Sequence, residues 1–368
     1  MKTILQIISD SNIGGAGRSL INYLRYEDAE NFRSHVVLPR NSALKPEIEK
    51  LGVPIYEIDA IADKSMDVSA IGILRQIIKE VKPDLIHTHG SMSGRIAAKL
   101  CGRKVIYTKH CAFPLGRLMS SPPGHLAVKT MDACLSDGVI AIGDSVREIL
   151  LESGVPGRKI HMLYNGVAPL EKADQAQRKA ARQACGFGDE DFVMGILARV
   201  ETYKGHAVIM DALEQLIDQG RNVKLLVAGQ GSYEEELRRR AAALPEGSVH
   251  FAGFVRDVER ALWAMDVQIN ASTESETSSL SLLEGMSLGL PAVVSDVGGN
   301  PVLIQDGENG RVVPRKDSKA LAACVAELMD DAQQMERLSA GAERIFRERF
   351  TGECFAHNVQ DVYRRVLK

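Results

Sequence analysis

The chain lacks the features that mark membrane-spanning, secreted and nucleic-acid-binding proteins. Its 368 residues include 45 Lys and Arg against 48 Asp and Glu, a net charge of -3, so the basic excess of a duplex binder is missing and no nucleic-acid partner is expected. No apolar run approaches the roughly 18 residues that span a bilayer. The first residues, MKTILQIISDSNIGG, offer no small-residue cleavage site, so they predict a first β-strand and not a signal peptide.

Cysteine is scarce, and its spacing forms no pairs. The six cysteines are Cys101, Cys111, Cys134, Cys185, Cys324 and Cys354. In a chain of this size such scatter predicts reduced, mostly buried thiols and a cytoplasmic protein. A metal or redox role for them is disfavoured, because a free cysteine usually behaves as a small buried hydrophobe.

The domain organisation follows from length and from the alternation of segments. A chain of 368 residues predicts two domains. Strand-like and helix-like segments alternate as far as residue 166. A polar stretch follows in which the alternation stops, and it starts again at Phe192. Such alternation is typical of an α/β fold, a parallel sheet covered by helices on both faces. We therefore expect two doubly wound, Rossmann-like domains, 1–167 and 168–348, facing a cleft, and a last helix in 349–368.

One stretch, ETSSLSLLEGMSLGLPAVVSDVGGNP, carries the strongest chemical pattern. Glu276 follows a strand-like run, and a helix is expected from near Ser279 to Gly289. Ligands of doubly wound sheets bind beyond the carboxyl ends of the strands, where the N-terminus of this helix would attract phosphate. Glu276 and Glu284 then fit as acceptors for the hydroxyl groups of a ribose and a sugar. The alternative is that these acids bind no ligand. They would then stabilise the positive N-terminus of the helix and lie on its solvated face.

Two further patterns fit a phosphorylated ligand. Arg199 and Lys204 follow another strand-like run and would clamp a diphosphate, or else are two surface cations. Gly14 and Gly15, between the first strand and first helix, let a backbone approach a phosphate closely. Their spacing departs from G-x-G-x-x-G, and no acid ends the next strand, so the pattern is a weak indication of NAD.

Histidines and acids provide two weaker patterns. His87, His89 and His110 lie at strand ends, with Cys111 beside them, and could be metal ligands. No acid is positioned to complete such a site, so we interpret His110 as a cleft residue and His87 as structural. The D-x-D pattern in GDEDF, residues 188–192, precedes a strand and is interpreted as a solvated turn.

In order and spacing, these segments resemble the retaining sugar transferases of glycosyltransferase family 4, which have the GT-B fold. The resemblance runs nearly the whole chain, through G-G after the first strand, PDLIHTHG, YTKH, AIGDSVRE, YNGV, R-x4-K-G, VAGQG, FAGFV and E-x7-E followed by GLPAVVSDVGG. It implies that 1–167 binds the acceptor and 168–348 binds a nucleotide-diphosphate sugar. It also implies that helix 349–368 crosses back onto the first domain.

The resemblance assigns roles by position. Glu284 would hold the ribose hydroxyls, Glu276 would contact the transferred sugar, and Arg199 and Lys204 would neutralise the departing diphosphate. His110 would touch the donor sugar and the reacting centre. The remaining expected donor contacts are the N–H groups near Ser279 and Leu280, the backbone at Phe254 and Val255 for the base, and Gly14 and Gly15 for the β-phosphate. The resemblance implies neither a metal nor a cofactor, because cations and a helix terminus would serve instead.

The sequence departs from the family pattern in two places. Thr277, Ser278 and Ser279 replace a Gly-Phe-Gly-like run, which leaves the sugar open, and Ala168 replaces an Asp after YNGV. Segment 111–130 is apolar and long for a plain loop. We favour a capping loop with a buried face over peripheral contact with the inner face of the membrane.

The resemblance predicts a cytoplasmic, retaining hexosyl- or N-acetylhexosaminyltransferase. It would use a UDP-linked donor and a saccharide or lipid-linked acceptor, as in the synthesis of cell-surface polysaccharide or glycolipid. The alternatives are an epimerase or hydrolase of sugar nucleotides, a non-catalytic partner subunit of a transferase and, third, a NAD dehydrogenase.

Overall fold

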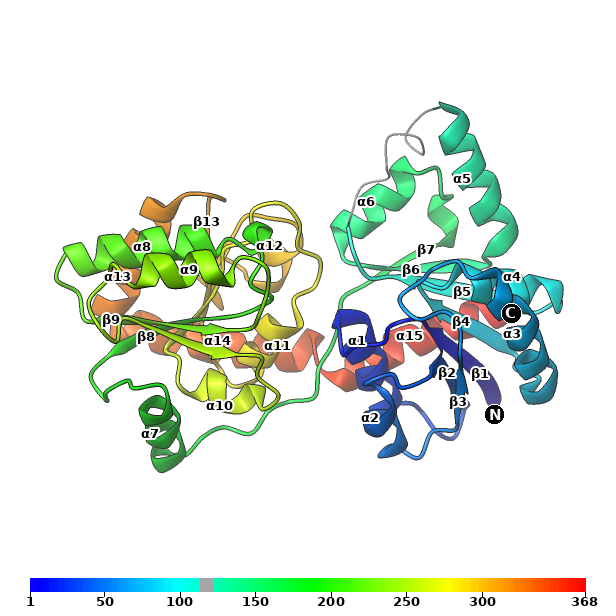
Figure 1. Cartoon of the computed structure of the whole chain (residues 1–368), viewed down its shortest axis with the longest axis horizontal. Coiled ribbons are helices and arrows are strands. Elements are labelled where there is room, and N and C mark those ends of the chain that lie inside the picture. The colour runs from blue at the N-terminus through cyan, green and yellow to red at the C-terminus, as the bar shows by residue number, and fades with distance from the viewer. Residues whose placement is uncertain (113–121) are drawn as a thin grey trace. The chain divides into compact units, whose positions relative to one another are not determined.

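The computed structural model describes residues 1–112 and 122–368 and divides the chain into two compact units. Unit 1 consists of Met1–Val167 and Thr351–Lys368, and unit 2 consists of Ala168–Phe350. Figure 1 shows that each unit is built around its own sheet. The chain leaves unit 1 once and returns to it once, since only its last helix rejoins the first unit.

Unit 1 contains a parallel sheet of seven strands in the order β3-β2-β1-β4-β5-β6-β7. The strands are β1 (Lys2–Ile8), β2 (Phe32–Pro39), β3 (Ile55–Ile58), β4 (Leu85–His89), β5 (Lys104–Lys109), β6 (Gly138–Ile142) and β7 (Ile160–Leu163). The helices between them are α1 (Gly15–Arg25), α2 (Lys45–Glu49), α3 (Val68–Val81), α4 (Met92–Leu100), α5 (Pro122–Leu135) and α6 (Asp144–Glu152).

Strand β1 shows why helices must cover both faces of this sheet. Side chains of a strand alternate between its faces. Ile4 and Ile8 belong to one hydrophobic cluster, and Leu5 and Ile7 belong to another. All four are fully buried. The apolar run therefore predicts a central strand with two covered faces, as in other parallel sheets.

Helix α15 (Gly352–Leu367) packs on unit 1. Thr351 caps its N-terminus by accepting a hydrogen bond from the Cys354 N–H, 3.2 Å away. On its buried face, Phe355, Val359 and Tyr363 join the cluster that contains Ile4. The amphipathic C-terminal segment thus completes the core of unit 1, as the sequence predicted.

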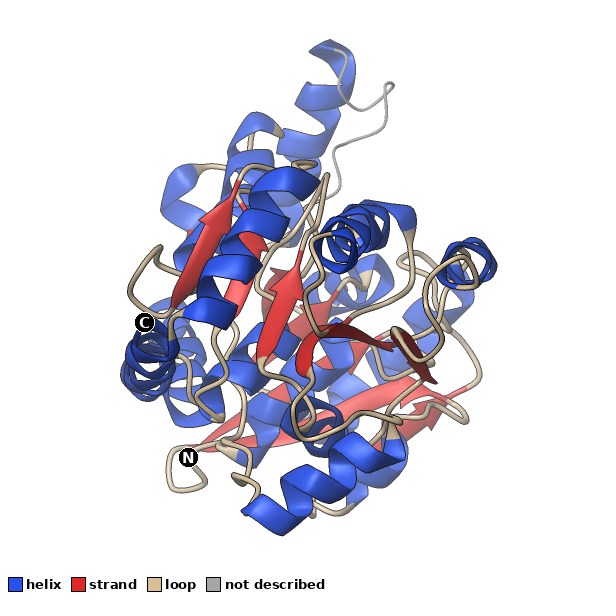
Figure 2. Ribbon diagram, turned by 90° about the vertical axis from the view of Figure 1, so that its left-hand side faces the viewer, coloured by secondary structure: helices blue, strands red, loops and turns tan. Residues whose placement is uncertain are grey.

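Unit 2 contains a parallel sheet of six strands in the order β10-β9-β8-β11-β12-β13, and Figure 2 shows helices in blue flanking strands in red. The strands are β8 (Phe192–Leu197), β9 (Val223–Ala228), β10 (Val249–Gly253), β11 (Val267–Asn270), β12 (Ala292–Ser295) and β13 (Gly310–Val313). The helices are α7 (Gln175–Ala184), α8 (His206–Asp218), α9 (Glu234–Ala241), α10 (Val258–Trp263), α11 (Leu280–Ser287), α12 (Asn300–Leu303), α13 (Ser318–Asp330) and α14 (Ala332–Arg349).

Two expectations need correction. Residues 122–130 form part of helix α5 and not a loop, because the parallel strands β5 and β6 require a crossover connection. Residues 113–121 of the 111–130 segment lie outside the described part of the chain. The cysteines are free, but only Cys324 is buried, and Cys111 and Cys134 are exposed. The expectation of mostly buried thiols is therefore wrong, because these two lie after a strand and on a surface helix.

Candidate active site

The Glu276 carboxylate is held at the carboxyl end of the sheet in unit 2. Its residue is 7% exposed and lies in the loop between β11 and α11. Three donors reach the same oxygen, Oε2: Lys204 Nζ at 2.7 Å, Asn270 Nδ2 at 3.2 Å and Ser272 Oγ at 2.9 Å. Because a buried carboxylate needs such partners, this arrangement keeps an anion in place.

Opposing influences set the pKa of Glu276. Burial is the largest and favours the neutral acid. The charge of Lys204 and the three hydrogen bonds together outweigh burial and hold the pKa of Glu276 below its ordinary value. Glu276 is therefore ionised at neutral pH and offers acceptors, as expected of a residue that contacts sugar hydroxyls.

Lys204 reaches Glu276 because two loops approach closely. Lys204 ends a short 3-10 turn after β8, and Gly205 follows with φ +76°. A Cβ on Gly205 would lie 1.8 Å from the Ala271 carbonyl oxygen, so only glycine fits. The Thr273 N–H also donates to the Tyr203 carbonyl, 2.8 Å away. These contacts join the loops after β8 and β11.

A Gly-Gly turn supports the loop of Glu276 from another side. Gly298, with φ +56°, follows β12, and a Cβ there would lie 2.0 Å from the Glu276 carbonyl oxygen. The N–H of Gly299 donates to the same carbonyl at 3.1 Å, and a Cβ on Gly299 would lie 1.6 Å from the Thr277 carbonyl oxygen. The two glycines therefore allow contact between two backbones, which fixes the loop before α11.

Helix α11 begins and ends where the sequence predicted. Ser279 is its N-cap and accepts from the Leu282 N–H at 3.4 Å, while Gly289, with φ +75°, follows its C-terminus. Glu284 lies on this helix and is 5% exposed, so its carboxylate is not on a solvated face. The alternative that Glu284 lies on a solvated helix face is therefore wrong. Leu280, the first helical residue, is half-buried.

Arg199 belongs to the same loop after β8 as Lys204 but is exposed. Its guanidinium bonds to the Tyr203 hydroxyl and lies 5.8 Å from the centre of that ring. Lys204 Nζ lies 5.6 Å from the same ring. The two predicted diphosphate cations therefore both lie near Tyr203, a residue that the sequence pattern did not indicate.

Phe254 and Val255 follow β10, the edge strand of the sheet in unit 2. Gly253, with φ +64°, turns the chain before them. Phe254 is 62% exposed and contributes little to the core. The backbone here was expected to meet the nucleotide base, and the exposed Phe254 ring adds a surface on which a base could stack.

Gly14 and Gly15 lie in unit 1, where α1 begins. Within the described part of the chain, a Cβ on Gly15 would have no neighbour within 4 Å, so packing does not require glycine there. Gly17 differs, since its Cβ would lie 2.4 Å from a Leu44 methyl carbon. The open space beside Gly15 therefore agrees with the expectation that a ligand approaches its backbone.

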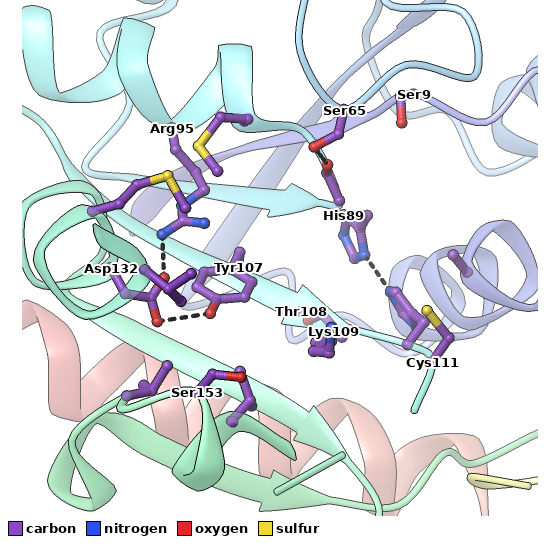
Figure 3. Close-up of a pocket in the computed structure, with 18 of the residues that line it drawn as sticks. Ser9, Ser65, His89, Arg95, Tyr107, Thr108, Lys109, Cys111, Asp132 and Ser153 are labelled. Atoms are coloured by element: carbon purple, nitrogen blue, oxygen red, sulfur yellow. Dashed lines mark hydrogen bonds and ion pairs between the residues drawn. The ribbon is translucent and has the colours of Figure 1, made fainter. Parts of the chain in front are cut away.

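His110 follows β5 and belongs to a hydrogen-bonded group of histidines in unit 1, part of which Figure 3 shows. His110 Nε2 lies 3.0 Å from His89 Nδ1. His87 is 3% exposed, and its two nitrogens lie 2.7 Å from the hydroxyls of Tyr363 and Thr108. The structural interpretation of His87 is therefore confirmed. The metal hypothesis gains no support, since no cluster of three possible ligands occurs in residues 1–112 and 122–368.

Burial keeps these histidines neutral. It lowers the pKa of His110 to about 4 and that of His87 to about 3. The pKa of His89 is lowered well below its ordinary value, first by burial and then by its histidine neighbours. All three imidazoles are therefore uncharged at neutral pH, so each carries one N–H.

A cavity of about 390 Å³ lies in unit 1 beside His110 (Figure 3). At one end Arg95 pairs with Asp132 at 2.5 Å and lies 4.1 Å from the centre of the Tyr107 ring. The Tyr107 hydroxyl donates to Asp132 at 2.9 Å. The charges of Arg95 and Asp132 are therefore paired with each other within the protein. The apolar lining comes from Ala16, Met92, Val128, Met131, Leu150 and Val155.

The D-x-D pattern lies apart from these groups. Asp189 pairs with Lys179 at 2.8 Å, and Asp191 accepts from the Gly188 N–H at 2.7 Å in the turn before β8. Both carboxylates serve local structure, so the interpretation as a solvated turn is confirmed.

Comparison with known proteins places both units in one group. Residues 13–169 match the model described as Glycosyltransferase Family 4, and residues 191–331 match Glycosyl transferases group 1. A phosphatidyl-myo-inositol mannosyltransferase of Mycobacterium leprae is 36% identical over 233 residues, 62% of this chain and 59% of that protein. A D-inositol 3-phosphate glycosyltransferase of Xylanimonas cellulosilytica is 28% identical over 312 residues, 77% of this chain and 72% of that protein.

Solved structures agree on the fold. The crystal structure of Anabaena HepE in complex with UDP and glucose superposes with a TM-score of 0.85 at 23% identity, covering 99% of this chain and 100% of HepE. A glycosyltransferase from Rickettsia africae has a TM-score of 0.86 at 19% identity, covering 100% of this chain and 99% of its own. The predicted GT-B fold is therefore confirmed.

Proposed function

The chain belongs to glycosyltransferase family 4, and from that premise we propose that it is a retaining enzyme that transfers a hexosyl or N-acetylhexosaminyl group from a UDP-sugar to an acceptor hydroxyl. The observation that carries the proposal is the buried pair of Lys204 and Glu276 at the carboxyl ends of β8 and β11, beside the N-terminus of α11. The UDP and glucose named for HepE support the choice of donor.

Each predicted residue has a role in donor binding. Glu284 accepts hydrogen bonds from the ribose, and Phe254 with Val255 lies against the base. Arg199 and Lys204 bind the diphosphate, and the N–H groups at Ser279 and Leu280 add the positive end of α11. The remaining proposed contacts are Gly14 and Gly15 at the β-phosphate, and His110 and Glu276 at the sugar.

The proposed mechanism follows from the way charge changes on UDP and on the sugar during transfer. The departing UDP gains negative charge while the sugar becomes oxocarbenium-like, so the site must stabilise an anion beside a cation. Arg199, Lys204 and the α11 N-terminus supply the positive charge, and we propose that neither a metal nor a cofactor is required. The acceptor hydroxyl attacks from the face that UDP leaves, so the anomeric configuration is retained. The leaving phosphate takes the proton of this hydroxyl. Removal of one stabilising donor raises such a barrier by about 3–4 kcal/mol.

The acceptor is proposed to bind unit 1, in the cavity beside His110. Its largely apolar lining suits a saccharide linked to a lipid or another apolar group.

Within the described residues no helix combines the length and hydrophobicity needed to cross a bilayer. For residues 111–130 the proposed alternative to a capping segment is peripheral contact with the cytoplasmic membrane face, and in the described part of this segment Leu126 is 65% exposed. Flotation with anionic liposomes tests this, and absence of the protein from the floated fraction would remove it.

A thermal-shift screen with UDP-, GDP- and ADP-sugars tests the donor. We expect stabilisation by a UDP-sugar that exceeds stabilisation by the other two classes. Product analysis then separates the reaction types. Transfer requires an acceptor for full turnover and preserves the anomeric configuration. Release of free sugar or of an epimer without an acceptor would instead identify a hydrolase or epimerase, and absence of turnover with every donor would favour a partner subunit.

A further inference from the structure

Three polar side chains form a continuous line across neighbouring strands of unit 1. Gln6 lies on β1, His89 ends β4 and His110 follows β5. Gln6 Oε1 lies 3.2 Å from His89 Nε2, and His89 Nδ1 lies 3.0 Å from His110 Nε2. Gln6 is 0% exposed and His89 is 6% exposed. In Figure 3 the dashed line from the His89 ring marks its contact with His110. The line therefore connects the buried sheet to the proposed site.

Hydrogen bonds set the direction of this line. The Ser34 hydroxyl donates to Glu27 at 2.5 Å, so its oxygen can only accept from the Gln6 amide nitrogen, 3.4 Å away. The same nitrogen donates to the Tyr363 hydroxyl at 3.0 Å. The amide nitrogen of Gln6 thus faces these oxygens, and its carbonyl oxygen faces His89. An amide oxygen only accepts, so His89 carries its hydrogen on Nε2.

The same reasoning extends to His110. A neutral imidazole with a hydrogen on Nε2 has an acceptor at Nδ1. The partner of His89 Nδ1 is His110 Nε2, which must therefore donate. This assigns the hydrogen of His110 to Nε2. The second ring nitrogen, Nδ1, then carries the lone pair.

We propose that Gln6 and His89 are positioning residues for sugar transfer, which hold His110 in one orientation as a neutral ring with its hydrogen on Nε2. The proposal rests on the proposed function, since it acts through His110. A neutral ring matters because a positive charge would repel the sugar as its oxocarbenium character develops. A fixed ring also avoids the cost of ordering it during reaction.

Kinetics of two His89 variants with the preferred UDP-sugar test the proposal. His89→Leu removes the acceptor and should lower kcat about 10- to 100-fold, the factor by which loss of a hydrogen-bond partner impairs metal-bound histidines, with little change in donor KM. His89→Asn supplies an amide oxygen near the position of Nδ1 and should recover most of the loss. Equal activity of wild type and His89→Leu would overturn the proposal, as would equal loss in both variants.

A double-mutant cycle distinguishes failure of the inference from failure of the assigned role. His110→Ala should reduce kcat, and adding His89→Leu to it should cause no further loss, because residues that act as a unit are not additive. If His110→Ala keeps full activity, the role of His110 in the proposed function fails. If His110→Ala is impaired and the second change lowers kcat again by its full factor, only the inference fails.

The tautomer itself is observable. In protein labelled with ¹⁵N-histidine, long-range proton–nitrogen spectra distinguish the two neutral forms, and the His110→Ala variant identifies the signals of His110. We expect the Nε2–H form in wild type and a mixture of forms in His89→Leu. A wild-type spectrum with the hydrogen on Nδ1 of His110 would overturn the assignment.

Discussion

Lys204 and Glu276 are 72 positions apart in sequence, yet their side chains form a 2.7 Å ion pair with 17% and 8% exposure. A buried pair of this kind costs desolvation on both sides, so neither charge can be removed alone without leaving the other uncompensated. The pair also places a cation where a diphosphate is proposed to depart. Loss of one of these side chains should therefore affect both the stability of unit 2 and the proposed transfer reaction.

Lys204→Ala should impair both properties. We expect kcat to fall about 100- to 1000-fold, since a cation aimed at the developing phosphate charge is lost. Thermal unfolding should show a stability loss of up to about 3–5 kcal/mol, because Glu276 remains buried without its counter-ion. Steady-state kinetics and differential scanning calorimetry measure the two effects.

Lys179→Ala is the matched control for Lys204→Ala. Lys179 also pairs with an acid, Asp189, but their side chains are 54% and 55% exposed. An exposed pair contributes about 1 kcal/mol or less, so this variant should keep its kcat and nearly its full stability. Equal behaviour of the two lysine variants would contradict the role of Lys204.

Glu284→Ala should weaken UDP binding. If the buried carboxylate accepts hydrogen bonds from the ribose, its loss removes about 1.5–3 kcal/mol, or roughly 10- to 100-fold in affinity. Isothermal titration calorimetry with UDP and with UMP should show the same factor for both ligands. Lys204→Ala should instead affect UDP more than UMP.

A deoxyribose analogue provides the control for Glu284. Wild type should bind UDP more tightly than the analogue that lacks the ribose hydroxyl, whereas Glu284→Ala should bind the two alike. Unchanged UDP affinity in Glu284→Ala would remove Glu284 from the donor site.

Gly298→Ala should disturb the loop of Glu276. Its Cβ would meet the Glu276 carbonyl oxygen at 2.0 Å, and φ is +56°, so the change adds both a clash and strain. Gly307→Ala is a control in the same unit, because Gly307 has φ +74° but, in the described part of the chain, nothing within 4 Å of its Cβ. Both variants should lose roughly 1–2 kcal/mol from strain. Only Gly298→Ala should also lose activity, and comparable kcat in the two would contradict a role for the turn.

The sequence predicted those parts of the molecule that depend on local pattern. The apolar runs around Ile4 and Met194 indicated buried strands, and Ser279 with Gly289 marked the limits of α11. The acid and cation that follow β11 and β8 were identified from their positions after strands. These features are local because strand ends and helix caps are encoded by a few neighbouring residues.

Partnerships between distant segments could not be predicted in the same way. Gln6 gave a signal, a polar residue inside an apolar strand, but its contacts with His89 and Tyr363 depend on strand order and on where α15 docks. Asn270 and Ser272 were visible at a strand end, but their convergence on one oxygen of Glu276 requires the folded loop. Side-chain register across the sheet decides such contacts, and a single sequence does not reveal it.

His206, the first residue of α8, should make unit 2 sensitive to acid. It is 2% exposed, and burial lowers its pKa from 6.5 to about 4. In the unfolded chain the pKa returns to about 6.5, so between pH 6.5 and 4 the unfolded state binds the extra proton. Stability is therefore unaffected by His206 above pH 7 and falls as pH drops through this window, by up to about 3 kcal/mol at pH 4.

His206→Leu should remove this contribution, so its Tm should fall less than that of wild type between pH 7 and pH 4.5. All other titrating groups are shared by the two proteins, so the difference between the curves isolates His206. His357→Leu is the matched control for replacing a histidine, since the His357 side chain is 68% exposed, and this variant should keep the stability loss that His206 causes. Parallel Tm curves for wild type and His206→Leu would show that the buried imidazole becomes protonated without unfolding, which would contradict the low pKa that burial imposes.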